Sequence, residues 1–170
     1  FGGENTYSLA RLGDLYQNAC RRIEEGKCDD ATALIYRLFE YMAQIRLSKN
    51  HSIKTKHIEI TELPREFVQK ECLVADQDGN VSLGLKQAYS LLDYKEDPLG
   101  HHFIEKYNHP ASKLKELLNK RNSSILAHGF EPISYDDCRM LKKEAEQCLD
   151  AHFSRWREWS HKAKFPELPV

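Results

Sequence analysis

The sequence predicts an all-α fold, and three observations support this prediction. Apolar residues recur every three or four positions, the spacing of amphipathic helices, over most of the 170 residues. Residue types that favour helix starts and ends stand at the borders of these segments. Strand-like sequence is confined to one short stretch, residues 57–60. We therefore expect a helical bundle that forms a single domain over residues 1–170.

The composition fits a soluble globular domain, with 41% hydrophobic and 30% charged residues. No stretch has the run of apolar residues that a membrane span needs, and no signal peptide is recognisable. Five cysteines without a Cys-x-x-Cys pair provide neither a zinc ribbon nor a redox motif, so we expect reduced thiols in a cytoplasmic protein. The chain starts with Phe1 rather than Met, and we expect it to be an excised C-terminal part of a longer protein.

The first two helices are expected at residues 7–25, ended by Gly26, and from a cap at Asp29 or Asp30 to about Lys49. The apolar face of the second helix is unusually wide, which favours a central position in the bundle. Its apolar residues are Leu34, Ile35, Leu38, Phe39, Tyr41, Met42 and Ile45.

The middle of the chain predicts shorter elements. After the extended piece at 57–60, Thr61 is expected to cap a short helix with Pro64 in its first turn. Two more helices are expected at residues 82–94 and 98–107.

Two helices complete the predicted bundle. Pro110 is expected to open the first of them, and Gly129 to end it. The last helix is expected to begin with a capping box at Ser134 and to run to about Lys162. One face of this last helix carries Cys138, Leu141, Ala145, Cys148, Leu149, His152, Trp156 and Trp159.

The helix that starts near Pro110 has an uncommon pattern. At 100° per residue, Arg121 and His128 fall in the same sector of roughly 100° as the apolar stripe Leu114, Leu117, Leu118 and Ile125. An unpaired buried cation is costly, so this face must meet water, a counter-charge or a partner surface. Two interpretations stay open. Arg121 and His128 lie at the rim of an ordinary packing seam, or they line a polar cleft between two copies of this helix.

The motif itself resembles the signature of HEPN ribonucleases, in which Arg and a polar residue precede a His by a short spacer. Here Arg121-Asn122 precede His128-Gly129, and the string 121–132 is similar to effectors that accompany type III CRISPR systems. The similarity extends to residues 31–47, to residues 58–64 and to the last helix. In such effectors a HEPN domain follows a CARF domain that senses cyclic oligoadenylates, and no such sensor is recognisable here.

The resemblance implies a two-fold symmetric homodimer that cleaves single-stranded RNA without metal or cofactor, in antiviral defence. Arg121 supplies a permanent cation for phosphate oxygens, and His128 can act as base or acid near neutral pH. Asn122 can bind phosphate or orient the His. We expect Arg121, Asn122 and His128 to be catalytic, and Lys120 and Ser124 to contact the RNA. The predicted activator is a cyclic oligoadenylate bound to a sensor domain outside this chain.

Charge and the remaining motifs leave alternatives. The net charge of −1 argues against a broadly basic surface, but residues 101–128 carry a local surplus of +3, with four Lys and one Arg against two Glu. His101, His102 and His109 could be metal ligands, although no acid or Cys stands at a matching spacing. Trp156 and Trp159 could stack on RNA bases, but their apolar face favours the core. A non-catalytic RNA-binding dimer and a toxin-type HEPN nuclease remain the alternative functions.

Overall fold

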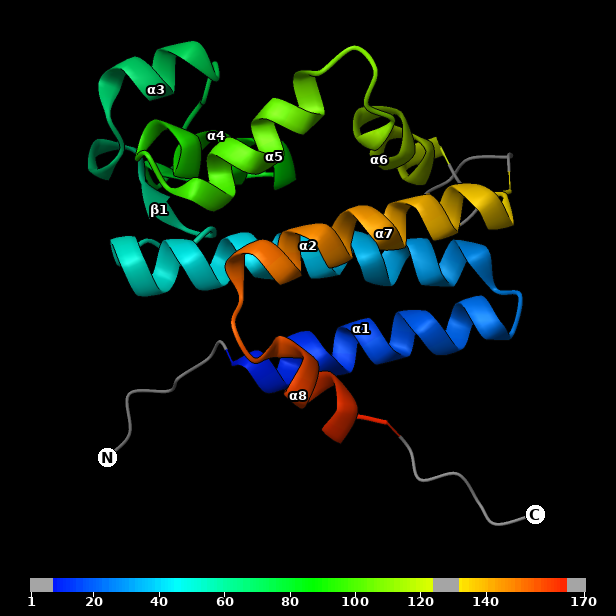
Figure 1. Cartoon of the computed structure of the whole chain (residues 1–170). Coiled ribbons are helices and arrows are strands. Elements are labelled where there is room, and N and C mark those ends of the chain that lie inside the picture. Colours follow the sequence, from blue (N-terminus) through cyan, green and yellow to red (C-terminus); the bar gives the residue numbers. More distant parts are fainter. Residues whose placement is uncertain (1–7, 124–131, 165–170) are drawn as a thin grey trace, which may run out of the picture.

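The computed structural model describes residues 8–123 and 132–164, and over these ranges the chain is all-α, as predicted. The exception to helix is a short antiparallel pair, β1 (Ile58–Glu59) and β2 (Asn80–Val81), in which Ile58 pairs with Val81. Figure 1 shows the elements in chain order. The helices are α1 (Leu9–Glu24), α2 (Cys28–His51), the 3-10 turn η1 (Ile60–Glu62), α3 (Arg65–Lys70), α4 (Leu85–Tyr94), α5 (Pro98–Asn108), α6 (Leu114–Ser123), α7 (Tyr135–His152) and α8 (Trp156–Lys162).

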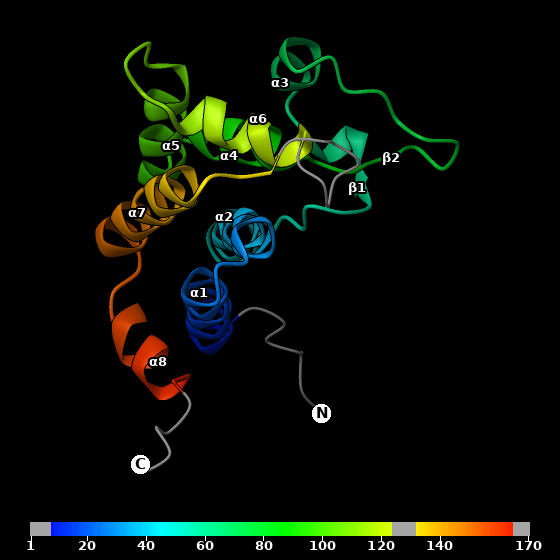
Figure 2. The same cartoon turned by 90° about the vertical axis from the view of Figure 1, so that its right-hand side faces the viewer.

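Helix α2 is the centre of the bundle because it is apolar on nearly all sides. It packs against α1, α4, α6 and α7, which surround it in the end-on view of Figure 2. This arrangement confirms the central position predicted from its wide apolar face. Although α2 is long, no helix in the described part of the chain could cross a membrane. The buried residues of α2 include Ala31, Ile35, Leu38, Phe39, Tyr41, Met42, Ala43 and Leu47.

The helix ends agree with the predictions in part. The Ser8 hydroxyl caps α1 by accepting from the Arg11 N–H, and Gly26 with φ +71° makes the turn into α2. The predicted cap of α2 is wrong, because Asp29 and Asp30 lie inside its first turn rather than before it. There the carboxylates still face the positive end of the helix dipole, which explains why the sequence places them at this helix start.

The segment before α4 differs from the prediction in two details. Thr61 belongs to η1, and α3 begins only after Pro64, whose backbone is extended with φ −59° and ψ 132°. Helix α4 begins at Leu85 rather than near residue 82, because the Leu83 N–H donates to the Thr55 carbonyl, 2.9 Å, directly after β2. The chain thus closes its small β pair before it returns to helix.

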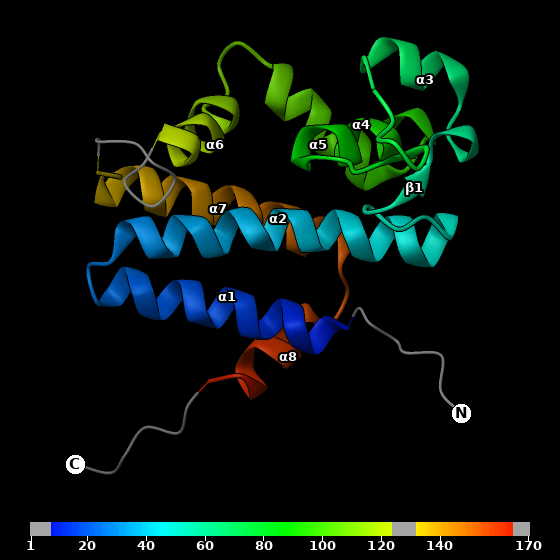
Figure 3. The ribbon, with the colours of Figure 1, turned by 180° about the vertical axis from the view of Figure 1, so that it is seen from behind.

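The predicted last helix is wrong, because it is broken in two. Helix α7 ends at His152, and Arg155 takes a left-handed conformation with φ +65° before α8 starts at Trp156. The break lets the buried Trp156 ring meet the Tyr16 ring of α1 edge-on, with centroids 4.9 Å apart, which confirms a core role for this residue. Helix α8 therefore lies against α1, as the view from behind in Figure 3 shows.

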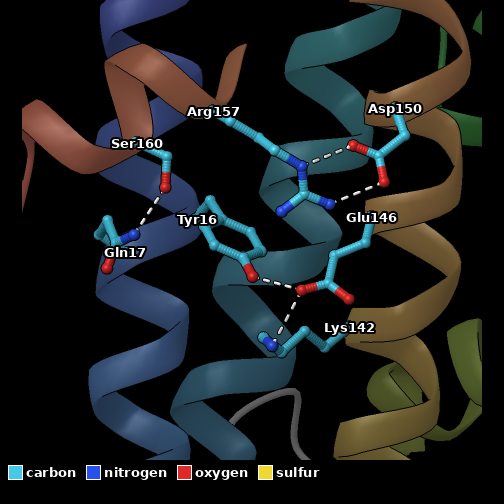
Figure 4. A network of polar contacts seen from close by, with 7 residues as sticks. All are labelled: Tyr16, Gln17, Lys142, Glu146, Asp150, Arg157 and Ser160. Carbon is cyan, nitrogen blue, oxygen red and sulfur yellow. Dashed lines mark hydrogen bonds and ion pairs between the residues drawn. The ribbon is translucent and has the colours of Figure 1, made fainter.

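Polar contacts tie α8 to both of its neighbours. The Gln17 amide of α1 donates to the Ser160 hydroxyl, 2.6 Å, and the Arg157 guanidinium of α8 holds Asp150 of α7 through two bonds of 3.0 and 2.7 Å. Fork-like pairing of this kind fixes geometry as well as charge. Figure 4 shows these residues beside Tyr16, Lys142 and Glu146. The Tyr16 hydroxyl donates to the Glu146 carboxylate, which also pairs with the Lys142 ammonium.

We predict that Gly13→Ala destabilises the domain, because α8 crosses α1 at this glycine. An added Cβ would lie 2.7 Å from the Trp159 carbonyl carbon and 2.8 Å from the Ser160 nitrogen, both backbone atoms that cannot turn aside. Overpacking of this kind typically costs about 1–3 kcal/mol of unfolding free energy. Urea denaturation followed by circular dichroism measures the loss. The control is Gly84→Ala, where the nearest atom to the added Cβ would be Gln87 Oε1, at an ordinary 3.6 Å. Equal stability of both variants would contradict the packing of α8 on α1.

Candidate active site

Helix α6 holds the described part of the predicted motif, and it begins at Leu114. The predicted start at Pro110 is wrong: Pro110 lies in a turn in which the Ser112 N–H donates to the His109 carbonyl, 3.0 Å. The Ser112 hydroxyl accepts from the Leu114 N–H, 3.2 Å, and so satisfies one of the donors that a helix start leaves unpaired.

The apolar stripe of α6 is covered within the chain itself. Leu114, Leu117 and Leu118 are at most 3% exposed, and α6 packs on α2 and α7. These leucines consequently need no second copy of the helix to bury them. The stripe alone is thus no longer an argument for a seam between two chains.

Arg121 lies at the edge of this packed stripe, over an aromatic ring. Its guanidinium carbon is 4.5 Å from the centroid of the Tyr36 ring, which belongs to α2. Both side chains are partly buried, and burial, followed by the nearby Glu40 carboxylate, raises the pKa of Tyr36. A cation over a ring face is stabilised by the ring quadrupole. The position of Arg121 fits the rim interpretation.

Lys120, the predicted substrate contact, takes part in ion pairs. Its ammonium lies 2.9 Å from the Asp137 carboxylate at the start of α7 and 3.3 Å from Glu116 one turn earlier on α6. The hydrogen bond to Asp137 raises the pKa of Lys120 and lowers that of Asp137. The pair ties α6 to the capped start of α7, where the Ser134 hydroxyl accepts from the Asp137 N–H as the capping box predicted.

Of the remaining predicted site residues, Asn122 is described as part of a helix, whereas Ser124 and His128 are not described. Asn122 is part of α6, at a backbone position that follows Arg121 by about 100° around the helix. Ser124 and His128 lie outside the described residues. The structure therefore brings Arg121 and Lys120 onto successive positions of one helix end, and the spatial relation of Arg121 to His128 stays a prediction.

The histidines considered as metal ligands do not converge. The His102 ring nitrogen Nδ1 lies 2.8 Å from Nε2 of His152 in α7, and Nδ1 of His101 lies 3.3 Å from the Asp93 carboxylate. The His109 ring accepts a hydrogen bond from the Ala111 N–H in its own turn. Burial lowers the pKa of both His102 and His152, so the pair favours the neutral form. Within the two described ranges, no three His, Cys, Asp or Glu side chains form a group that could hold a metal ion.

Two surface hollows flank α6. One, of about 680 Å³, lies between α5, α6 and α7 and includes Lys106, whose ammonium pairs with Glu144. The other, of about 590 Å³, lies between the end of α5 and the outer face of α6 and includes Tyr107 and Asn119. The sequence predictions missed this second hollow and the contact of Tyr36 with Arg121. Helical spacing could have placed Asn119 beside the motif, whereas no local signal pairs a residue of α2 with Arg121.

Comparison with known proteins supports one family. A family model described as Csm6 HEPN domain matches residues 4–151, which is most of the chain. No match was found among curated proteins or among solved structures. The matched range covers the central helix, residues 58–64, the motif segment and all of α7 but its last residue. The chain therefore belongs to the Csm6 HEPN domain family, a family of CRISPR-associated helical domains.

Proposed function

We propose that this protein is an endoribonuclease of CRISPR defence that cleaves single-stranded RNA with Arg121, Asn122 and His128. The observation that supports this most is the presence of these three residues, at HEPN spacing, in a chain that belongs to this family. The position of Arg121 adds support, because its guanidinium is held over the Tyr36 ring at the border of the packed face of α6 rather than in the core. The proposal includes Lys120 and Ser124 as RNA contacts.

The proposed reaction needs a base, an acid and positive charge. A base takes the proton of the ribose 2′-hydroxyl, the 2′-oxygen attacks phosphorus, and the bond from phosphorus to the 5′-oxygen breaks as an acid protonates that oxygen. The products are a 2′,3′-cyclic phosphate and a 5′-hydroxyl. Arg121 would stabilise the charge of the phosphorane, and His128 would transfer a proton. Asn122 would bind a phosphate oxygen or orient His128.

The activator belongs to the same proposal. By resemblance to effectors of type III systems, a cyclic oligoadenylate bound to a sensor domain would control cleavage. The HEPN domain would then carry the chemistry and the sensor its regulation. Under this proposal residues 1–170 form one functional unit, the nuclease domain, in a cytoplasmic protein.

We predict that Arg121→Ala and His128→Ala each nearly abolish cleavage of a labelled RNA while the fold is kept. Loss of one preorganised charge stabiliser costs about 10²–10³-fold in rate, and loss of a general acid or base about 10²–10⁴-fold. The assay is run in EDTA, because every group in the proposed reaction is a side chain. Rates come from gel-resolved products, and melting curves report the fold.

Matched controls separate the motif from charge in general. Arg139 is exposed and lies over the Tyr135 ring at 5.7 Å, the same kind of contact as that of Arg121 but on α7, and His161 is an exposed histidine of α8. Arg139→Ala and His161→Ala should cleave as the unchanged protein does. Wild-type rates in Arg121→Ala and His128→Ala would place the active site elsewhere. An unchanged protein that binds RNA without cleaving it would indicate the non-catalytic alternative.

We also propose a two-fold homodimer whose interface includes the C-terminal end of α6. The reason is chemical: two proton transfers need two groups, and the motif of one chain offers one histidine. Light scattering at micromolar concentration is expected to give twice the 19.8 kDa of one chain. A single-chain mass together with a cleavage rate per chain that does not change on dilution would argue against a shared site.

We predict that Tyr36 positions Arg121 through its ring. Tyr36→Phe keeps the ring face and should cleave normally, whereas Tyr36→Leu removes it. A cation–π contact contributes about 1 kcal/mol, so Tyr36→Leu should lower kcat by roughly fivefold with little change in KM. Tyr135→Leu, which removes the ring under Arg139, is the control. If Tyr36→Phe and Tyr36→Leu lose kcat equally, the ring face is not what matters.

A further inference from the structure

The hollow between α5 and α6, which we call the Tyr107 hollow, faces away from the core. Because α6 turns its leucines inward, Lys115 and Asn119 are exposed on its opposite side and line the hollow. Asn108 and His109, where α5 ends, form the other wall and are also exposed. Its volume of about 590 Å³ falls in the range of small-molecule sites.

The hollow is continuous with the motif along one helix face. Residues four and seven positions apart share a face, so the helix positions of Lys115, Asn119 and Asn122 follow one another in one row along α6. The row spans about 10 Å of the helix axis and ends at a residue of the proposed active site. An RNA strand that is bound at the motif and follows this face of α6 would therefore next contact Asn119 and Lys115.

The groups in the hollow match those that bind single-stranded RNA. Lys115, with its ammonium 5.8 Å from the Tyr107 ring centroid, offers a cation for phosphate, and the Asn119 amide can donate to and accept from a base edge. The Tyr107 ring is anchored by stacking on the buried Phe103, with centroids 5.8 Å apart. The carboxylate that lines the hollow, Glu116, is paired with a lysine rather than opposed to an incoming phosphate.

The other hollow of α6 fits RNA less well. Its lysines, Lys106, Lys113 and Lys143, lie with the carboxylates of Glu105 and Glu144, and the Lys106 ammonium pairs with Glu144. It also lies on the side of α5 and α7, away from the row that leads to Asn122. Its position next to the motif therefore favours the Tyr107 hollow.

We propose that the Tyr107 hollow binds a nucleotide of single-stranded RNA adjacent to the one that is cleaved, with Lys115 on a phosphate and Asn119 on the base edge. The proposal rests on the proposed function, because it takes the motif as the place where the strand is cut. It assigns substrate contacts upstream of the motif on α6, in addition to those expected of Lys120 and Ser124.

The test measures binding apart from cleavage. Fluorescence anisotropy follows the binding of labelled homopolymer RNAs whose 2′-hydroxyls are all methylated, so that none can attack phosphorus. Lys115→Ala should weaken binding of every homopolymer and reduce the slope of log affinity against log salt by about 0.7, the value of one phosphate contact on a single strand. Asn119→Ala should keep the slope but reduce the difference in affinity between the homopolymers.

The control is Lys113→Ala, which removes an equally exposed lysine two positions before Lys115 that lines the other hollow. This variant should bind with the affinity and the salt slope of the unchanged protein. Equal effects of Lys113→Ala and Lys115→Ala, or none from Lys115→Ala and Asn119→Ala, would overturn the proposal, as would an unchanged protein that binds no RNA.

The two proposals fail in different ways. Binding that depends on Lys115 and Asn119, in a protein that does not cleave unmodified RNA, would support the hollow and refute the nuclease. Cleavage that needs Arg121 but is indifferent to Lys115 and Asn119 would support the nuclease and refute the hollow.

Discussion

Burial of the central helix is the constraint on which the rest of the structure depends. Helix α2 is apolar on nearly every side, so it is stable only when other helices cover it all round. Helices α1, α4, α6 and α7 do so. The cover also satisfies polar groups: Tyr89 of α4 donates its hydroxyl to the Phe39 carbonyl of α2, 2.8 Å, while its ring stacks on Phe103 of α5. The hydrophobic requirement of one helix thus positions most of the others.

The proposed site follows from the same constraint. Because the leucines of α6 are needed against α2 and α7, the helix can rotate very little, and Arg121 must lie at the border of the packed face. The aromatic ring of Tyr36 meets the cation there and offsets part of the cost of partial burial. A residue that looked anomalous on an apolar stripe thus has a physical place, and the opposite face of α6 remains for polar contacts.

A buried carboxylate, Asp97, lies where α5 begins. Asp97 is 5% exposed, caps α5 by accepting from the Leu99 N–H, 3.0 Å, and accepts from the Asn50 amide at the end of α2, 3.2 Å. Arg46 and His51 of α2 lie 3.4 and 3.6 Å from it. A buried charge is tolerated only when it is paired and hydrogen-bonded, so the start of α5 is held to the end of α2. The turn that leads to α6 begins from this anchored helix.

The sequence by itself determined the all-α class, the central helix, the cap at Ser134 and the family resemblance, because periodicity, capping and motif spacing are local properties. Only the tertiary structure decided the break between α7 and α8, which depends on Trp156 reaching Tyr16 far away in the chain. The same holds for the ring beneath Arg121, since its partner belongs to α2. Local patterns specify which face of a helix must be buried, but the residue that it meets is settled by how distant helices pack.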